Sequence, residues 1–403
     1  MIKILHTADL HLGKSLHDQS LAEDQAHVLK QLAEILEAQE FHALIIAGDV
    51  YDRSIPSPEA VGLFSAFLAD IKKLKNVPEL LVIPGNHDSA IRLGYGKELF
   101  RGLGIHFVCD TEEAFRPAAV LRGSEGDSCA CFLLPFLGAG SLKNDEGEVL
   151  RSQAELAAEA AKRLDAAQKE CRARGVSYAI LAAHLFAGGG RESDSERIFL
   201  GGAEQVDMGM FSGFDYAALG HLHRFQKAGV KEGGTFAWYS GSPLAYSFDE
   251  AGGKKCFISL TLERGEVKVD SIPVQALRNM RRLEGNFRRF MTEPLQDEEL
   301  KAAKNDYLEI TLTGNELTEN ALSVLKMRFP YLLSVHQEAA LSSLQSGKDR
   351  TLNEEGAGRR DIAADFKDFL AELYGEAEED KVKLFNETYT EAAGAAEIQH
   401  EAR

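Results

Sequence analysis

The sequence lacks features that would place the chain in or across a membrane. No apolar run approaches the roughly 18 residues that a membrane-spanning helix needs. The opening segment, residues 1–6, leads directly into a polar motif and leaves no room for a signal peptide. We therefore expect a cytoplasmic protein with no membrane contact.

Cysteine is scarce, and its spacing excludes two classes of protein. The five cysteines are odd in number and contain no C-x-x-C pair, which argues against a disulfide framework and against a thiolate zinc site. Cys129 and Cys131 lie in an apolar run and share one face of a predicted strand, so we expect both in the core.

Basic residues are too few to balance the acidic ones. Lysine and arginine number 45 against 63 aspartates and glutamates, and the formal net charge is -18. Because basic side chains that displace counterions supply most non-specific affinity for nucleic acid, the chain is not expected to hold DNA by its overall charge. A local basic patch at Arg278, Arg281 and Arg282 is either a contact for a polyanion or a solvated face.

Strands and helices alternate over the first ninety residues, as in a layered α/β domain. Strands are expected at 2–6, 43–47, 80–83, 118–121, 129–134, 178–183, up to Gly220, 235–240, 254–262 and 267–272, and helices at 21–36, 58–74 and 150–174. The last three strands, separated by glycine-containing turns, suggest a second sheet. We predict two sheets packed face to face with helices outside, forming one domain over residues 1–273.

The pattern changes near Pro273. Residues 275–340 predict a small α+β module with a helix-like basic stretch, strands at 307–312 and 332–336, and a helix at 319–329. Residues 341–359 are polar and predict a linker. Residues 360–403 predict a helical tail, whose apolar face either docks on another chain or packs on the chain's own domain. That face consists of Ile362, Phe366, Phe369, Leu370 and Leu373.

Polar side chains follow several of the predicted apolar strands. In chain order the motifs are Asp9-Leu10-His11, Gly48-Asp49, Gly85-Asn86-His87-Asp88, His184 and Gly220-His221-Leu222-His223. Open α/β sheets place ligands beyond the carboxyl ends of their strands. A pair of divalent cations needs oxygen and imidazole ligands with one carboxylate between them, and this series supplies both kinds. We therefore predict a two-metal phosphoesterase site.

Each member of the series has a predicted role. Asp49 bridges the two cations; the first cation takes Asp9, His11 and His223, and the second takes Asn86, His184 and His221. His87 stays unligated and contacts the scissile phosphate or protonates the leaving oxygen, while Asp88 fixes its tautomer. A ligand set without thiolate suits manganese, iron or zinc better than magnesium alone.

The ordered motifs resemble the calcineurin-like metallophosphoesterase superfamily, whose fold is a double β-sheet sandwich flanked by helices. Within it the chain is most similar to the SbcD family of bacterial nuclease subunits. That similarity rests on residues 4–13, 47–52 and 84–89, on Leu134-Pro135-Phe136, and on residues 218–223, 240–244 and 247–250. The resemblance implies a Mn²⁺-dependent DNA nuclease with 3′ to 5′ double-strand exonuclease and single-strand or hairpin endonuclease activity, acting in DNA recombination, replication and repair.

The resemblance also implies partners. Members of the family act with SbcC, an SMC-type ATPase with a long coiled coil, as a homodimer within a heterotetramer that binds DNA ends and hairpins. It further implies that residues 275–340 cap the DNA cleft and that the tail grips the coiled coil of the ATPase. Such a partner would supply the positive field that this acidic chain lacks.

Two alternatives remain open. Residues 48–53 read G-D-x-x-D-R, which also resembles the protein phosphatase signature, so Arg53 either contacts phosphate or forms a surface salt bridge. Some relatives supply a second catalytic histidine near Asp52, where this chain has aspartate. A binuclear phosphatase or phosphodiesterase for a small molecule or phosphoprotein would use the same metals, but the module and apolar helix beyond residue 273 favour the nuclease.

Overall fold

The computed structural model describes residues 1–187, 205–228, 236–292, 297–314 and 318–338, together with 382, 383 and 385. The chain divides into two compact units, Met1–Ala339 and Ala340–Arg403. The fold below is that of the first unit. The predicted linker, helical tail and apolar face at Ile362, Phe366, Phe369, Leu370 and Leu373 lie outside the described residues.

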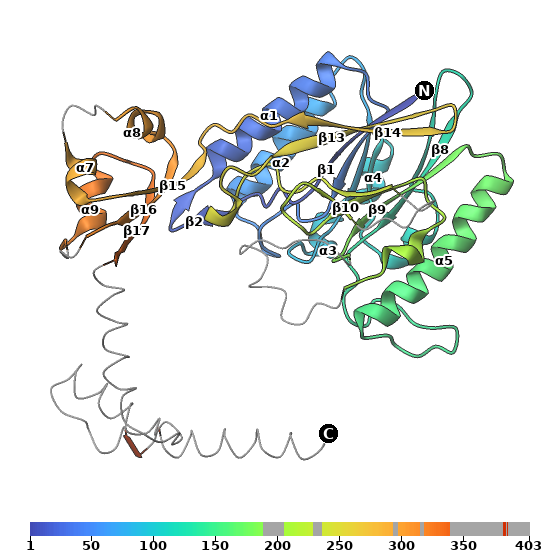
Figure 1. Ribbon diagram of the computed structural model, residues 1–403. Coiled ribbons are helices and arrows are strands. Elements are labelled where there is room, and N and C mark those ends of the chain that lie inside the picture. Colours follow the sequence, from blue (N-terminus) through green and yellow to red (C-terminus); the bar gives the residue numbers. More distant parts are fainter. Residues whose placement is uncertain are drawn as a thin grey trace. The chain divides into compact units, whose positions relative to one another are not determined.

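Two six-stranded sheets form the body of this unit (Figure 1). The first has the order β14-β13-β1-β4-β5-β6, and the second has the order β11-β12-β10-β9-β8-β7. The first comprises β1 (Ile2–Thr7), β4 (Ala43–Ala47), β5 (Glu79–Ile83), β6 (Ile105–Phe107), β13 (Cys256–Glu263) and β14 (Glu266–Pro273). The second comprises β7 (Ala119–Arg122), β8 (Ser128–Leu134), β9 (Tyr178–His184), β10 (Tyr216–Gly220), β11 (Gln226–Lys227) and β12 (Phe236–Tyr239).

The central strands of both sheets are parallel, so their carboxyl ends lie at one edge of each sheet. In the first sheet β1, β4, β5 and β6 run parallel, and in the second β8, β9, β10 and β12 do. Central strands such as β4 and β9 are buried along their whole length, as expected for parallel strands covered on both faces.

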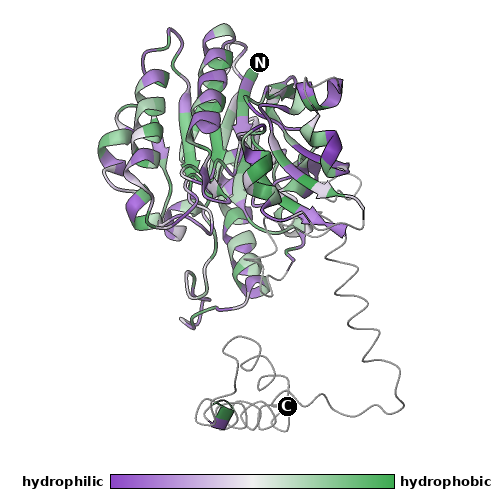
Figure 2. Cartoon of the chain, turned by 90° about the vertical axis from the view of Figure 1, so that its left-hand side faces the viewer, coloured by the Kyte–Doolittle hydropathy of each residue, from purple (hydrophilic) through white to green (hydrophobic). Residues whose placement is uncertain are grey.

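The core of the two sheets consists of three apolar clusters, one between the sheets and one on the outer face of each sheet. Side chains of both sheets meet in one apolar cluster that includes Ile45, Cys129 and Cys131, which confirms the core prediction for the two cysteines. Helices α1 (Ala22–Ala38) and α2 (Pro58–Ile71) cover the outer face of the first sheet, and α5 (Gln153–Ala173) covers that of the second. Figure 2 shows the apolar residues concentrated in the central strands and alternating with polar ones along the helices.

Local sequence explains where the long helices begin. Ser57 caps α2 by accepting a hydrogen bond from the amide of Ala60, and Pro58 occupies the first turn, where no amide donor is needed. Ser152 and Glu155 form a reciprocal capping box at the start of α5.

The remaining elements are short. They are β2 (Ser15–Leu16), β3 (Gln19–Ser20), α3 (Ala90–Leu93), α4 (Lys97–Arg101), and the 3₁₀ turns η1 (Thr111–Phe115), η2 (Met208–Phe211) and η3 (Phe248–Glu250). Within the described part of the chain, none of the helices has the length and apolar character needed to cross a bilayer.

The predicted fold class is confirmed, but the membership of the sheets differs from the prediction. β13 and β14 were expected in the second sheet, yet β13 pairs antiparallel with β1 and extends the first sheet. Alternating hydrophobicity identifies a strand but does not encode the edge that it joins, because β13 and β12 both bury one face in the same inter-sheet core.

Residues 280–337 form a separate three-stranded parallel sheet with its own core. It contains β15 (Met280–Gly285), β16 (Tyr307–Leu312) and β17 (Leu332–Gln337), with α7 (Phe287–Met291), α8 (Glu298–Ala303) and α9 (Ala321–Lys326) packed around Phe290, Leu325 and Phe329. The basic stretch at the start of this module was expected to be helix-like, but most of it forms strand β15. It forms a strand because Met280 and Leu283 are buried where β15 pairs with β16. The domain boundary near residue 274 stays a prediction.

Candidate metal centre

The predicted ligands follow the carboxyl ends of strands in both sheets. Asp9, Asp49 and Asn86 come after β1, β4 and β5, while His184 ends β9 and His221 follows β10. Five of the six acidic and histidine ligands are almost fully buried, and His221 is 8% exposed. The parallel topology thus brings residues more than two hundred positions apart into one cluster.

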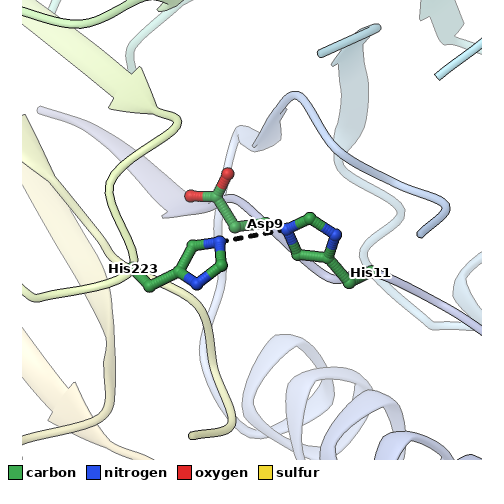
Figure 3. Close-up of side chains that lie close together, drawn as sticks. All are labelled: Asp9, His11 and His223. Carbon is green, nitrogen blue, oxygen red and sulfur yellow. Dashed lines mark hydrogen bonds between the residues drawn. The ribbon is translucent and has the colours of Figure 1, made fainter. Parts of the chain in front are cut away.

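The first group consists of Asp9, His11 and His223, shown in Figure 3. One ligand atom from each lies within 4.8 Å of the others, and Nε2 of His11 is 3.1 Å from Nε2 of His223. Oδ2 of Asp9 is buried and has no hydrogen-bond partner in the described part of the chain. Two converging imidazole nitrogens and an unsatisfied carboxylate oxygen fit a divalent cation.

The second group consists of Asn86, His184 and His221. Oδ1 of Asn86 lies 3.0 Å from Nε2 of His184 and 3.1 Å from Nδ1 of His221. Asp49 lies between the groups, with Oδ2 3.4 Å from Nε2 of His184 and 3.6 Å from Nε2 of His11. This is the place expected of a carboxylate shared by two cations.

Four of these residues adopt a left-handed backbone. Asp9, His11, Asp49 and His221 have φ values of 54°, 44°, 47° and 106°. Only eight described non-glycine residues have positive φ, so half of them belong to this cluster. Hydrogen bonds hold the turns in place, including the Asp9 amide to the Gly48 carbonyl at 3.0 Å. Concentrated backbone strain of this kind is typical of functional sites.

Two motif glycines permit the close approach of the sheets. A Cβ on Gly48, whose φ is 91°, would lie 2.1 Å from Nδ1 of His184. A Cβ on Gly220 would lie 1.8 Å from the carbonyl oxygen of Ala47. Both contacts are far inside van der Waals distance, so glycine is required for His184 and His221 to reach the cluster.

Burial and mutual charge displace the pKa values in the cluster. Burial raises the pKa of Asp9 to about 7 and lowers those of His11 and His221 to about 4 and about 3. For Asp49 burial opposes ionisation, but the imidazoles of His184 and His11 outweigh it and hold its pKa well below the usual range. Burial lowers the pKa of His184, yet Asp49 outweighs it and raises the value to about 9. A bound cation would compensate these buried carboxylates and favour the neutral imidazoles that coordinate it.

His87 lies beside the cluster, but its partner differs from the prediction. Its amide donates to Oδ1 of Asp49 at 2.9 Å, and its Nδ1 lies 2.9 Å from the carbonyl oxygen of Asp52. The carboxylate of Asp88 instead accepts hydrogen bonds from the amides of Val50, Tyr51 and Gly85. Asp88 therefore ties two ligand loops together, and Nδ1 of His87 lies beside the Asp52 carbonyl, whereas the prediction placed the Asp88 carboxylate there.

Two carboxylates lie beside the ligands, and sequence reasoning assigned neither of them a contact with a ligand. Oδ1 of Asp52 lies 3.3 Å from Nδ1 of His11, and Oε1 of Glu250 lies 3.5 Å from Nδ1 of His223. Burial opposes their ionisation, but the neighbouring histidines and lysines hold the pKa of each carboxyl below its usual range. Asp52 belongs to the same motif as Asp49, which was a usable signal. Glu250 lies in the 247–250 stretch that carries the resemblance, but nothing in the sequence indicated that it contacts His223.

The predicted substrate-binding arginines all lie near carboxylates. Arg53 is 3.8 Å from Asp52 and its side chain is 81% exposed, so both interpretations of this residue remain. Arg278 binds Glu23, Asp24 and Tyr331 with a side chain that is only 12% exposed. Arg281 pairs with Asp306 and Arg282 with Glu309. A polyanion at this face would have to compete with these ion pairs.

Comparison with known proteins identifies the family. Residues 2–225 match the family described as calcineurin-like phosphoesterase. The chain belongs to this family. The SbcD subunit of the nuclease SbcCD from Staphylococcus epidermidis is 31% identical over 338 residues, which cover 83% of this chain and 85% of the relative. The predicted relationship to that family is thereby confirmed.

Solved structures give weaker likenesses. A dimetal phosphatase from Danio rerio has a TM-score of 0.42 at 10% identity, over 68% of this chain and 97% of its own. The calcineurin-like phosphoesterase YfkN from Bacillus subtilis has a TM-score of 0.35 at 14% identity, over 68% and 90%.

Family membership makes the chain a phosphoesterase and implies a binuclear divalent metal centre. The residues present fit such a centre, because imidazole, carboxylate and amide donors converge and one buried carboxylate oxygen lacks a partner among the described residues.

Proposed function

We propose that the chain is a Mn²⁺-dependent DNA nuclease that cleaves double-stranded ends from 3′ to 5′ and opens hairpins and single strands endonucleolytically. Its work would lie in DNA recombination, replication and repair. The observation that supports this most strongly is the convergence of the candidate ligands from both sheets in a chain that is 31% identical to an SbcD subunit of the nuclease SbcCD.

In this proposal each of the two groups of ligands described above binds one cation. Asp9, His11 and His223 would hold one cation, Asn86, His184 and His221 would hold the other, and Asp49 would be shared between them. When bound, two divalent cations supply an activated nucleophile and stabilise charge on the phosphate and leaving oxygens. Manganese suits this mixture of imidazole, carboxylate and amide donors.

His87 is the proposed catalytic residue. The Asp52 carbonyl favours the tautomer with the proton on Nδ1, because a carbonyl oxygen can only accept a hydrogen bond. Nε2 is then the nitrogen that contacts the scissile phosphate or exchanges a proton with the leaving oxygen. The hydrogen bond from the backbone amide of His87 to Oδ1 of Asp49 fixes His87 beside the proposed bridging ligand. Asp88 contributes by holding the loops of both residues.

Cleavage of end-labelled linear duplex DNA by the purified chain with Mn²⁺ tests the proposal. We expect cutting that EDTA abolishes and Mn²⁺ restores, and His87→Ala should abolish cutting while Mn²⁺ stays bound. His106→Ala is the matched control, since His106 pairs with Glu79 outside the cluster. Mn²⁺-loaded protein that ignores DNA alone and with its partner would contradict the nuclease.

We further propose that the chain acts with an SMC-type ATPase of the SbcC kind, as a homodimer within a heterotetramer. The proposed division of labour is that residues 275–340 cap the DNA and residues 360–403 bind the coiled coil of the ATPase. An acidic chain with a formal charge of -18 gains affinity for DNA if a partner supplies basic residues. Affinity capture from native extract should recover a large coiled-coil ATPase, and its absence would contradict the partnership alone.

A phosphatase or phosphodiesterase for a small molecule or phosphoprotein is the alternative function. The exposed Arg53 beside Asp52 favours it, because such an arginine can contact a terminal phosphate. Rapid turnover of p-nitrophenyl phosphate, lost in Arg53→Ala, together with no cleavage of DNA would favour this alternative.

A further inference from the structure

The two imidazoles of the first group each stand between the candidate cation position and a carboxylate. Their Nε2 atoms face one another at 3.1 Å. The other nitrogen of each ring lies within ion-pair distance of an acid: Nδ1 of His11 is 3.3 Å from Asp52, and Nδ1 of His223 is 3.5 Å from Glu250. Nδ1 of His11 is buried and has no aligned hydrogen bond among the described residues, so Asp52 is its nearest charged neighbour rather than a bonded acceptor. A ring that gives Nε2 to a cation must carry its proton on Nδ1, where these carboxylates lie.

Each carboxylate also accepts a hydrogen bond from a lysine. Nζ of Lys14 donates to Asp52 at 2.7 Å, and Nζ of Lys255 donates to Glu250 at 2.5 Å. The side chains of Asp52 and Glu250 are 12% and 1% exposed, so solvent and salt screen them weakly. Two separate segments of the chain therefore repeat one arrangement of lysine, carboxylate and imidazole.

The second group is supported differently. Nδ1 of His184 lies 2.9 Å from the backbone carbonyl of Ala47, and 3.9 Å from Asp9, which is itself a candidate ligand. His221 places its Nδ1, not its Nε2, 3.1 Å from Asn86. A neutral carbonyl polarises an imidazole less than an ionised carboxylate does, so the two groups differ in donor strength.

We propose that Asp52 and Glu250 are positioning residues that fix the tautomers of His11 and His223 and set the affinity of the first cation position. The inference rests on the proposed metal centre and adds two residues to it. Neither carboxylate belongs to the predicted ligand set, and each acts on the cation only through an imidazole.

A purely structural role predicts something different. If the carboxylates served only to neutralise buried lysines, removing Lys14 would be as harmful as removing the acid of Asp52. If Asp52 acts on His11, Lys14→Met keeps the acting group and spares cation binding. Asp52→Asn preserves the shape of the side chain and the backbone carbonyl that contacts His87, so it changes the carboxylate alone.

Titration of the metal-free full-length chain with Mn²⁺, followed by the electron paramagnetic resonance signal of the free ion, tests this. We expect two bound ions in the wild type. Asp52→Asn and Glu250→Gln should each weaken one binding constant by about 10- to 100-fold and leave the other unchanged. Lys14→Met should leave both unchanged. Glu79→Gln is the matched control, because it removes a carboxylate 2.8 Å from the imidazole of His106 outside the cluster.

The melting temperature of each metal-free variant separates folding from binding. Weakened binding in Asp52→Asn with wild-type melting supports the proposal even if Glu250→Gln, at a buried position, unfolds. Wild-type Mn²⁺ binding in Asp52→Asn, or equal weakening in Lys14→Met, would overturn it. A wild-type chain that binds no Mn²⁺ would overturn the metal centre and the proposed function with it, which is a distinct outcome.

Discussion

Replacing Arg278 with methionine removes a guanidinium group that three side chains share. Its Nη1 donates to Asp24 at 2.8 Å, and its Nη2 donates to Glu23 at 2.6 Å and to the hydroxyl of Tyr331 at 2.9 Å. The guanidinium carbon also lies 4.3 Å from the centre of the Tyr331 ring. Methionine retains an apolar stem of similar length and leaves these polar partners without their cation.

The expected cost comes mainly from Asp24. Its side chain is 2% exposed, its Oδ1 has no hydrogen-bond partner in the described part of the chain, and its Oδ2 would keep the hydroxyl of Tyr307. Removing one partner of a buried ion pair typically costs about 3–5 kcal/mol, because the other charge stays buried. Glu23, 75% exposed, adds little. We expect the midpoint of thermal unfolding to fall by roughly 5–10 °C.

Circular dichroism of the full chain, measured without DNA, gives this midpoint. Asp24→Asn in the Arg278→Met background should recover part of the loss, since it removes the uncompensated carboxylate. The competing hypothesis from sequence places Arg278 on a DNA phosphate. Two results together would refute the structural reasoning. Arg278→Met would melt like the wild type, and the slope of its DNA affinity against salt concentration would fall by about one phosphate contact.

Three further outcomes follow from described contacts. Gly220→Ala should lose Mn²⁺ binding and cleavage together, because its Cβ would lie 1.8 Å from the Ala47 carbonyl; retained Mn²⁺ binding in calorimetry would contradict this. Ser152→Ala should lower the free energy of unfolding in urea by about 1 kcal/mol through loss of the α5 cap. The hydrogen bond from His106 lowers the pKa of Glu79 below its ordinary 4.5. The pair therefore stabilises the folded chain above pH 4.5, and this stabilisation is lost as the pH falls through the lowered pKa of Glu79. Glu79→Gln should therefore flatten the melting profile below pH 4.5, and an unchanged profile would argue against the pair.

The sequence predicted the part of the site that depends on strand ends. β4 occupies residues 43–47 and β16 residues 307–312, as expected from their apolar runs. Once strand ends and a parallel topology are fixed, Asp9 and Asn86 must lie at one edge of the first sheet, and His184 must lie at the corresponding end of a strand in the second. These features depend on local periodicity and on a general rule of α/β folds, both of which can be evaluated without coordinates.

Long-range partners were beyond the reach of that reasoning. The contact of Glu250 with His223 and the pairing of Arg278 with Asp24 join segments whose separation in space no periodicity encodes. Asp88 was assigned to the neighbouring ring of His87, but three backbone amides take its carboxylate. Residue type and motif singled out His223, Arg278 and Asp88 as candidates, and tertiary geometry decided what each one contacts.

The left-handed backbone at Asp9, His11, Asp49 and His221 places candidate ligands in the site but lowers the thermal stability of the chain. Each such conformation is disfavoured by about 1–3 kcal/mol for a residue with a side chain, and glycine would relax it. Directed evolution that selects only for thermal stability would therefore enrich glycine at these positions. The resulting variants would be more stable but inactive, because glycine has no side chain to act as a ligand. Any selection for robustness has to include turnover in the same round.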